Sequence, residues 1–236
     1  MNAGTKTARA ATPAEDVSAG VGIDIVSDAI CPWCYIGKRQ AERALALLAD
    51  EGLRFPVRWN PFQLNPDMPK EGVDRVTYRA AKFGSAERAV ALDAQVAGAA
   101  RAVGLDFRLD LIRRTPNTLD AHRLIWFAGR RSLQDAAMEA VFAAYFTHGR
   151  DIGLPDVLAD CGAQAGLDRD ELAAFLRGQV AATEMLAADH AAREAGVNGV
   201  PAFFLAGYNL FSGAQPAEKI AEALRRGHRI LTSQAA

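Results

Sequence analysis

The fold follows from residues 21–50, which read VGIDIVSDAICPWCYIGKRQAERALALLAD. Residues 21–26 form a short apolar run rich in β-branched side chains, which is typical of a buried strand. Residues 35–50 are dominated by Ala, Leu, Glu, Lys and Arg, which favour a helix. Cys31 and Cys34 lie between these segments. The stretch therefore predicts a strand, a turn that carries Cys-Pro-Trp-Cys, and a helix.

The two cysteines have the spacing of a redox pair. Positions i and i+3 in the first turn of a helix bring both sulfurs within disulfide reach. The unpaired amides and the positive end of the helix dipole favour a thiolate on Cys31, and Cys34 is expected to be more buried. Pro32 suits a first helical position, whereas Trp33 offers the thiolate no charge. This pattern predicts attack by Cys31 on a disulfide and resolution by Cys34.

Two other interpretations of the pair remain open, namely half of a zinc site and two unrelated thiols. The remaining cysteine, Cys161, stands alone among apolar residues at helical spacing, which predicts an inert buried thiol. The four histidines are scattered without a ligand pair at short spacing. We therefore predict no metal site and favour redox chemistry.

Further along the chain, the predicted elements change from strands to helices and back. Residues 55–59 predict a second strand, residues 74–193 a series of helices, and residues 200–211 a hairpin before a final helix. One α/β domain made of residues 21–66 and 181–236, with an all-helical domain at 67–180 inserted into it, explains this order. Residues 1–20 lack an apolar core and predict a disordered segment without a secretory signal.

Composition limits the classes of partner. The chain of 236 residues carries 27 Lys and Arg against 28 Asp and Glu, a net charge of −1. Such a balance excludes strong attraction to nucleic acid or to an anionic membrane surface. The sequence has no apolar run near the roughly 20 residues that a membrane-spanning helix requires. Three cysteines do not form the framework of a disulfide-rich secreted protein, so we expect a cytoplasmic protein.

Five motifs in a fixed order resemble a known family. They are DIVSDAICPWCYIG at 24–37, NPFQLNP at 60–66, PNTLDAH at 116–122, GVNGVP at 196–201 and SGAQP at 212–216. Together they resemble the DsbA-like thioredoxin superfamily, and specifically its FrnE-like dithiol-disulfide oxidoreductases and isomerases, over about residues 22–231. The resemblance implies a thioredoxin fold with an inserted helical domain.

The resemblance also implies roles for residues outside the cysteine pair. Pro201 would lie opposite the pair after a cis peptide bond, leaving the backbone of Val200 free to bind an extended substrate. His122 and Asn117 would face this site from the helical domain. The alternatives are a trans proline that begins an edge strand, a structural histidine, and an asparagine that only caps a helix.

Resolution by Cys34 needs a proton acceptor, and two carboxyls are candidates. Asp24 and Asp28 share one side of the strand if the strand extends that far. We expect Asp24 to be buried behind the pair and to take the proton, with Asp28 as a turn or helix cap or as the alternative acceptor.

The leading functional hypothesis is a cytoplasmic oxidoreductase or isomerase that acts on protein or small-molecule disulfides. The redox-active disulfide would replace any cofactor, glutathione remains open as a co-substrate, and the protein would be a monomer or homodimer. The resemblance leaves a second hypothesis, a glutathione-dependent small-molecule isomerase or transferase of the kappa or hydroxychromene-carboxylate isomerase type, or a polyketide tailoring enzyme. A third is a noncatalytic binding module, which would require an inaccessible Cys31.

Overall fold

The computed structural model describes residues 21–233. The segment 1–20, for which the sequence predicts disorder, lies outside the described residues, as do residues 234–236. The elements follow in the order β1 (Ile23–Ser27), α1 (Pro32–Asp50), β2 (Val57–Pro61), β3 (Val73–Asp74), α2 (Arg75–Phe83), α3 (Ala86–Ala102), β4 (Arg114–Thr115), α4 (Leu119–Gly129), α5 (Gln134–Phe142), η1 (Ala143–Thr147), α6 (Pro155–Gln164), α7 (Arg169–Arg177), α8 (Ala182–Glu194), β5 (Ala202–Leu205), β6 (Tyr208–Ser212) and α9 (Ala217–Ser233).

A four-stranded sheet joins the two ends of the chain. Its strand order is β2-β1-β5-β6, with β1 parallel to β2 and antiparallel to β5. Ile25 lies at the centre of this sheet, opposite Trp59 on one side and Phe203 on the other. All three side chains are buried, which explains why the apolar run in β1 pairs with strands on both sides. The sequence between β2 and β5 supplies helices α2 to α8, so the fold is α/β with a helical insertion.

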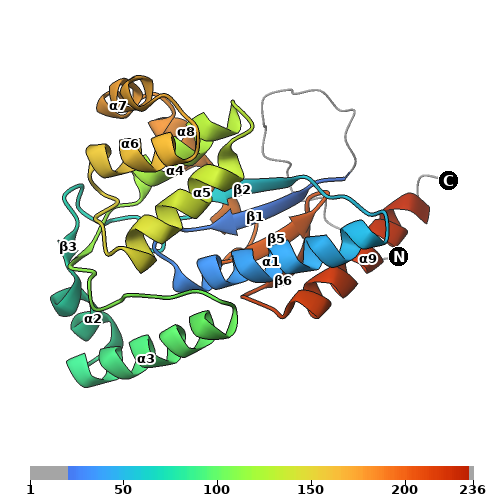
Figure 1. Cartoon of the computed structure of the whole chain (residues 1–236), viewed down its shortest axis with the longest axis horizontal. Coiled ribbons are helices and arrows are strands. Elements are labelled where there is room, and N and C mark those ends of the chain that lie inside the picture. The colour runs from blue at the N-terminus through green and yellow to red at the C-terminus, as the bar shows by residue number, and fades with distance from the viewer. Residues whose placement is uncertain (1–20, 234–236) are drawn as a thin grey trace.

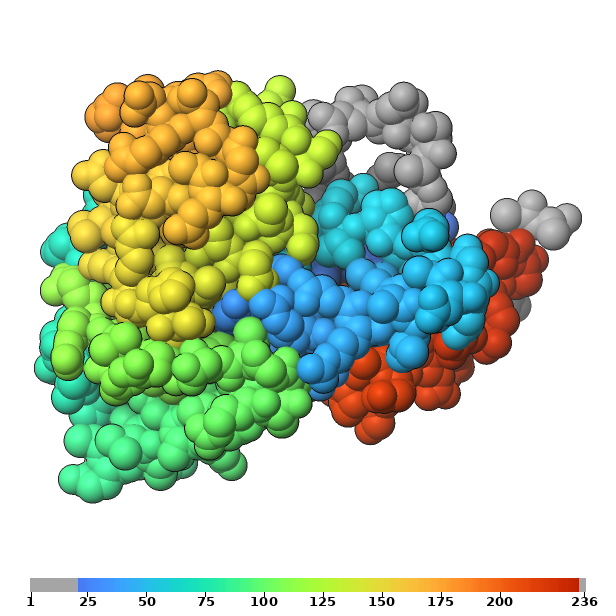
Figure 2. Space-filling model, viewed as in Figure 1, coloured from blue at the N-terminus to red at the C-terminus, as the bar shows by residue number. Residues whose placement is uncertain are grey.

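Helix α1 places the cysteine pair at one end of the sheet. Pro32 occupies the first helical turn, where a missing N–H costs no hydrogen bond. The side chains of Ala41, Ala44 and Leu48 form the buried face of the helix. Helix α1 lies beside α9 (Figure 1), and in Figure 2 the blue atoms of α1 lie between the red atoms of α9 and the green and yellow atoms of the insertion. The pair therefore lies where α1 meets the insertion.

The insertion contains more than regular α-helices. Strands β3 and β4 form a two-residue antiparallel ladder, Val73 opposite Thr115 and Asp74 opposite Arg114, where the sequence predicts no strand. Residues 134–147, which lie in the stretch that the sequence predicts as a series of helices, divide into α5 and the short π-helix η1. Such π-helical turns are rare and often lie near functional sites.

Helix α5 is fastened directly to the edge of the sheet. The side-chain oxygen of Gln134 accepts a hydrogen bond from the backbone N–H of Trp59 at 2.8 Å. The side-chain amide of Gln134 donates to the carbonyl of Trp59 at 3.1 Å. The indole N–H of Trp59 donates to Asp135 at 3.0 Å. The insertion therefore occupies hydrogen-bonding groups that an edge strand would otherwise leave open.

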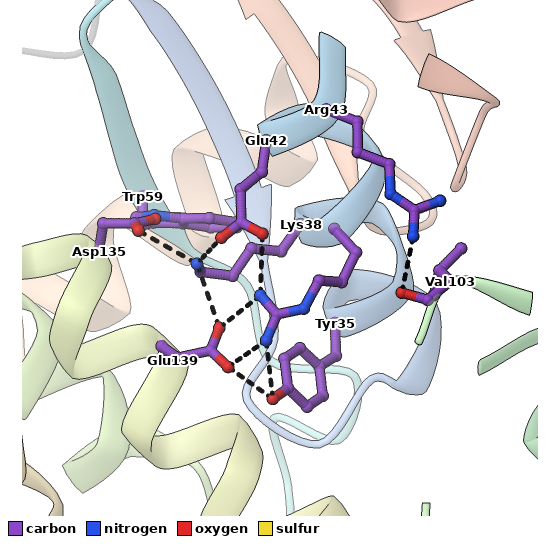
Figure 3. A network of polar contacts seen from close by, with 9 residues as sticks. Tyr35, Lys38, Glu42, Arg43, Trp59, Val103, Asp135 and Glu139 are labelled. Carbon is purple, nitrogen blue, oxygen red and sulfur yellow. Dashed lines mark hydrogen bonds and ion pairs between the residues drawn. The ribbon is translucent and has the colours of Figure 1, made fainter. Parts of the chain in front are cut away.

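An ionic cluster forms a second attachment between α1 and α5 (Figure 3). Lys38 is 2% exposed, and its Nζ lies 3.1 Å from Asp135 and 3.2 Å from Glu139. Glu42, one turn further along α1, also pairs with Lys38. Arg39 forms ion pairs with Glu42 and Glu139. Because a buried ammonium needs charged partners, this cluster fixes how the insertion lies against α1.

No helix within residues 21–233 combines the length and the apolar character needed to cross a membrane.

Candidate active site

Cys31 and Cys34 lie at the start of α1, as their spacing predicts. Cys31 is the N-cap residue, with an extended backbone (φ −87°, ψ 112°), and Cys34 lies in the first turn. Both thiols are free. Cys31 is 4% exposed and Cys34 0%, whereas Trp33 between them is 41% exposed. The two sulfurs therefore differ in access, and the indole of Trp33 forms part of the outer surface.

The segment before β5 contacts the first cysteine. The thiol of Cys31 donates a hydrogen bond to the carbonyl oxygen of Val200, with 3.5 Å between sulfur and oxygen. The peptide bond between Val200 and Pro201 is cis. The carbonyl of Pro201 accepts a hydrogen bond from the backbone N–H of Gly213 at 2.7 Å, which holds this segment beside the hairpin.

Gly37 permits close packing of Pro201 against α1. A Cβ atom at position 37 would lie 2.9 Å from Cγ of Pro201, closer than carbon atoms normally approach. The absent side chain at Gly37 therefore lets the proline ring lie against the helix that carries the pair. This role of Gly37 has no signal in the sequence, because the contact joins residues that are far apart in the chain.

The surroundings of Cys34 keep this thiol protonated. Burial is the largest cause that raises the pKa of Cys34 well above its ordinary value, and the adjacent Cys31 raises it further. The hydroxyl of Ser27 and the backbone N–H of Asp28 act in the opposite direction and partly offset this increase in pKa. Cys34 therefore remains a thiol until a neighbouring group takes its proton.

The side chain of Asp24 does not lie in the buried position that the sequence predicts for it. Its carboxylate is half-buried and pairs with the guanidinium of Arg58, at 2.8 Å and 2.9 Å, and with the amide of Asn60 at 3.2 Å. The parallel register of β1 and β2 places Arg58 directly opposite Asp24. Asp24 thus lacks the predicted burial behind the pair, and its role as proton acceptor stays a prediction.

The alternative carboxyl, Asp28, is fully buried. Its Oδ2 accepts a hydrogen bond from the backbone N–H of Leu64 at 2.7 Å. Its Oδ1 lies 3.5 Å from Nε2 of His122, a buried side chain of α4 that is also 3.2 Å from the carbonyl oxygen of Phe62. The insertion therefore contributes an imidazole that reaches the carboxyl three residues before Cys31.

Asn117 joins two backbone segments. Its amide donates to the carbonyl of Met68 at 2.7 Å, and its oxygen accepts from the backbone N–H of Leu119 at 2.9 Å. These polar atoms therefore contact a loop and the start of α4 rather than the cysteine pair. The hydrogen bond to Leu119 agrees with the alternative given by the sequence, a residue that caps the helix, and a role of Asn117 in substrate binding stays a prediction.

Cys161 lies apart from this chemistry, in α6. Burial raises its pKa to about 11, so the thiol is protonated near neutral pH. Within residues 21–233, no three His, Cys, Asp or Glu side chains gather in a way that would hold a metal ion.

A family model for the DSBA-like thioredoxin domain matches residues 22–225. The chain belongs to this family. Among solved structures, this DSBA-like chain is similar to a probable DsbA oxidoreductase from Streptomyces coelicolor, with 34% identity and a TM-score of 0.78 over 88% of this chain and 89% of the other.

Two more distant structures share the fold of this DSBA-like chain. A 2-hydroxychromene-2-carboxylate isomerase has 20% identity and a TM-score of 0.64, covering 91% of this chain and 99% of its own. A cytosolic disulfide reductase, DsbM from Pseudomonas aeruginosa, solved with glutathione, has 18% identity and a TM-score of 0.59, covering 91% and 100%. At these identities the likeness concerns the fold alone.

Proposed function

We propose that this DSBA-like protein is a cytoplasmic thiol–disulfide oxidoreductase or isomerase in which Cys31 attacks a disulfide and Cys34 resolves the mixed disulfide. One observation carries the proposal: of the two cysteines in one helical turn, Cys31 keeps a small exposed area, whereas Cys34 is fully buried. Cys31 lies at the N-terminus of α1, where it is the more accessible of the two thiols. Cys34 is fully buried, and burial holds its pKa high.

In the first step, the thiolate of Cys31 attacks one sulfur of a substrate disulfide, and the other sulfur leaves as a thiolate. In the second step, Cys34 gives up its proton and attacks Cys31. The bond between Cys31 and the substrate breaks, its electron pair leaves with the second substrate sulfur, and the Cys31–Cys34 disulfide forms. The substrate disulfide gains two electrons that the protein dithiol loses, and the reverse sequence would oxidise a substrate dithiol.

Val200 and Trp33 supply the contacts for a substrate chain. The carbonyl of Val200, which the Cys31 thiol now occupies, becomes available to an extended substrate once that sulfur is bonded. The exposed indole of Trp33 gives an apolar surface beside the attacking sulfur. These groups recognise a backbone and an apolar neighbour rather than a fixed sequence, which suits a range of protein or small-molecule disulfides.

A redox titration tests this function. We would equilibrate the Cys161→Ala protein at a series of ratios of reduced to oxidised glutathione, quench with acid, alkylate, and measure intact mass. We expect one reversible two-electron transition between dithiol and disulfide, and we expect it to vanish in Cys31→Ser. The midpoint gives the direction in which the pair works in its compartment. A pair that forms no disulfide at any ratio would refute the proposal.

A second candidate is a glutathione-dependent small-molecule enzyme. An open groove with a volume of about 400 Å³ lies between the loop 64–69 and α2, and its lining includes Leu64, Met68, Tyr78 and the polar side chains of Asn65 and Asp67. This mixture of apolar side chains with a phenol suits an aromatic substrate. The same titration separates the two functions, because a glutathione that remains bound without a Cys31–Cys34 disulfide favours the second.

A further inference from the structure

The open groove between the loop 64–69 and α2, called here the 64–69 groove, lies at the end of the sheet that carries the cysteine pair. Residues 64–69, Val73 and Tyr78 line it. Strands β1 and β2 are parallel, so the turn that carries Cys31 and the loop after β2 leave the sheet at one edge. Strand β5 is antiparallel to β1, so the cis peptide before β5 lies at that edge as well. Open α/β sheets bind ligands outside the carboxyl ends of their parallel strands, which is where this groove lies.

Two hydrogen bonds connect the groove to the attacking cysteine. The backbone N–H of Leu64 donates to the carboxylate of Asp28 at 2.7 Å. The carbonyl of Asp28 accepts from the backbone N–H of Cys31 at 3.0 Å. An extended polypeptide advances about 3.3 Å per residue, so a chain bonded through its own cysteine to Cys31 needs only a few residues to reach Leu64. The groove is therefore continuous with the site of attack.

The wall formed by the loop is held in place from behind. The backbone N–H of Gln63 donates to Asp189 at 2.7 Å, and the carbonyl of Gln63 accepts from Arg193. The amide of Asn117 donates to the carbonyl of Met68 at 2.7 Å. These contacts fix both ends of the wall before any substrate arrives. Binding there costs little ordering of the protein, which favours affinity.

Asn65 offers the groove a pair of free donors. Its Oδ1 accepts hydrogen bonds from the hydroxyl of Tyr78 and from Nζ of Lys82, the latter at 3.3 Å. Nζ of Lys82 also lies 2.7 Å from the oxygen of Tyr78. Because an ammonium group only donates, the amide atom that faces it must be the oxygen. The amide nitrogen of Asn65 has no acceptor within residues 21–233, so its two N–H groups remain available to a carbonyl of a bound chain.

Leu64 and Met68 supply the apolar part of the groove. Leu64 is half-buried, and Met68 is buried at the base of the loop. The flexible side chain of methionine adapts to partners of different shape. None of the residues of α2, which forms the other wall, is buried, so this wall has few packing contacts to lose when a bulky side chain enters.

We propose that the 64–69 groove binds the polypeptide segment beside the substrate cysteine and selects segments that carry a large apolar side chain; this inference rests on the dithiol exchange proposed above. Leu64 and Met68 contact that side chain. The amide of Asn65 donates to a backbone carbonyl of the same segment. The groove thereby determines which protein disulfides react fastest, whereas the exchange itself takes place at Cys31 and Cys34.

Peptides with a leucine at different positions test this specificity. Short Ser–Gly peptides, each with one cysteine, are joined through that cysteine to 5-thio-2-nitrobenzoate in a mixed disulfide. One leucine is placed at successive positions on either side of the cysteine, and one peptide contains none. Reduced Cys161→Ala protein attacks the peptide sulfur and releases the coloured thiolate, whose rate is measured at low peptide concentration. We expect leucine at one or two neighbouring positions, on one side only, to raise the rate about tenfold, a gain that burial of one leucine can supply.

Four variants locate the preference. Leu64→Ser and Asn65→Ala should each lower it to about threefold or less, because each removes one contact. Val90→Ser is the matched control, since Val90 is 69% exposed in α3 outside the groove, and it should keep the preference of the parent protein. Trp33→Ala removes the other apolar surface near Cys31. A preference that Trp33→Ala abolishes and the two groove variants retain belongs to the indole and overturns the groove.

The parent protein alone decides the remaining outcomes, even if a variant does not fold. Equal rates for all peptides overturn the groove, as does a gain from leucine at every position, which reports unspecific apolar attraction. If the protein nevertheless ends as the Cys31–Cys34 disulfide by intact mass, dithiol exchange stands. A parent protein that forms this disulfide with none of the peptides overturns dithiol exchange itself.

Discussion

The Nζ atom of Lys38 lies 3.1 Å from Oδ2 of Asp135, although the two residues belong to α1 and to the insertion. Burial by itself lowers the pKa of Lys38, but Asp135, Glu42 and Glu139 outweigh burial and raise the pKa above its ordinary value. The ammonium group is therefore charged in the folded protein and bound to both parts of the molecule. Lys38 lies one turn after Cys34 in α1. Loss of its charge would therefore disturb the helix that carries the cysteine pair.

Replacement of Lys38 by Met should destabilise the protein by about 2 kcal/mol, below the ~3–5 kcal/mol typical of a broken buried pair because its acidic partners are partly hydrated. The variant leaves Glu42 and Glu139 to Arg39, and it leaves Asp135 with the indole N–H of Trp59. Urea unfolding gives the difference. Arg225→Ala, which breaks the exposed pair with Glu51, is the control and should change the midpoint little. Equal midpoints for both variants would contradict a supporting role for Lys38.

Stability should fall in acid through Glu139. Burial alone raises the pKa of Glu139, but hydrogen bonds from Arg39 and Tyr35 outweigh burial and hold the pKa below its ordinary value. Above the ordinary carboxylate pKa of about 4.3, Glu139 therefore contributes its full stabilising free energy. This free energy is lost as the pH falls from that value to the lower pKa of Glu139 in the folded protein. Glu139→Gln should be less stable at pH 7 and show a shallower decline between about pH 5 and 3 in urea unfolding; an identical slope would refute this assignment.

Cys34→Ser should accumulate a mixed disulfide at Cys31, because the resolving thiol is missing while the attacking sulfur is retained. Cys31→Ser, the matched variant, should form none. Both proteins would be incubated with oxidised glutathione and analysed by intact mass without reductant. Equal adduct formation by the two variants would show that the roles assigned from burial are reversed or absent.

Gly37→Ala should impair the first step of exchange. Alanine favours a helix over glycine by about 1 kcal/mol, but the new methyl group would meet Cγ of Pro201 at 2.9 Å. We expect Pro201 and Val200 to move away from Cys31. The attack of Cys31 on 5,5′-dithiobis(2-nitrobenzoate), measured by the release of the coloured thiolate, should then slow several-fold. Gly98→Ala in α3, where a Cβ meets nothing within 4 Å, should only raise the free energy of unfolding. A Gly37→Ala protein with an unchanged release rate would argue against the proline contact.

Alkylation should distinguish the three thiols. Burial raises the pKa of both Cys34 and Cys161, the latter to about 11, so neither should react with iodoacetamide at pH 7.5 in the native protein. Cys31, which keeps a small exposed area, should react first. Peptide mapping identifies the labelled residue. A native protein that resists labelling at all three positions would instead support a noncatalytic binding module.

Local sequence was sufficient for the elements around the cysteine pair. The change from a β-branched run to helix-forming residues predicted β1 and α1 correctly. The strands predicted after residue 200 indicated a single sheet whose strands come from both sides of the helical insertion. The division of residues 134–147 into α5 and η1 was missed, since the residues of a π-helix have the same composition as an α-helix. The β3–β4 ladder was missed because two-residue strands leave too short a pattern to detect.

The site was harder to predict, because its decisive contacts join distant residues. Asp24 and Asp28 have the same strand parity, and only the register of β1 with β2 shows that Arg58 forms an ion pair with Asp24. Lys38 appears in the sequence as an ordinary charged residue of a helix surface, whereas its partner Asp135 comes from the insertion. Asp28 was predicted from its strand parity as the alternative proton acceptor, whereas its neighbour His122 was predicted only through the family resemblance.

The side chain of Gln134 has a consequence beyond holding α5 in place. Because it both receives a hydrogen bond from Trp59 and returns one, it imitates a single residue of a neighbouring strand. A strand of another chain therefore cannot pair with β2 at Trp59, because Gln134 already binds both backbone groups of that residue. Within residues 21–233, the sheet can be extended only beyond β6, so self-association through extended backbone would be one-sided and would stop at a pair of molecules rather than continue into a fibre.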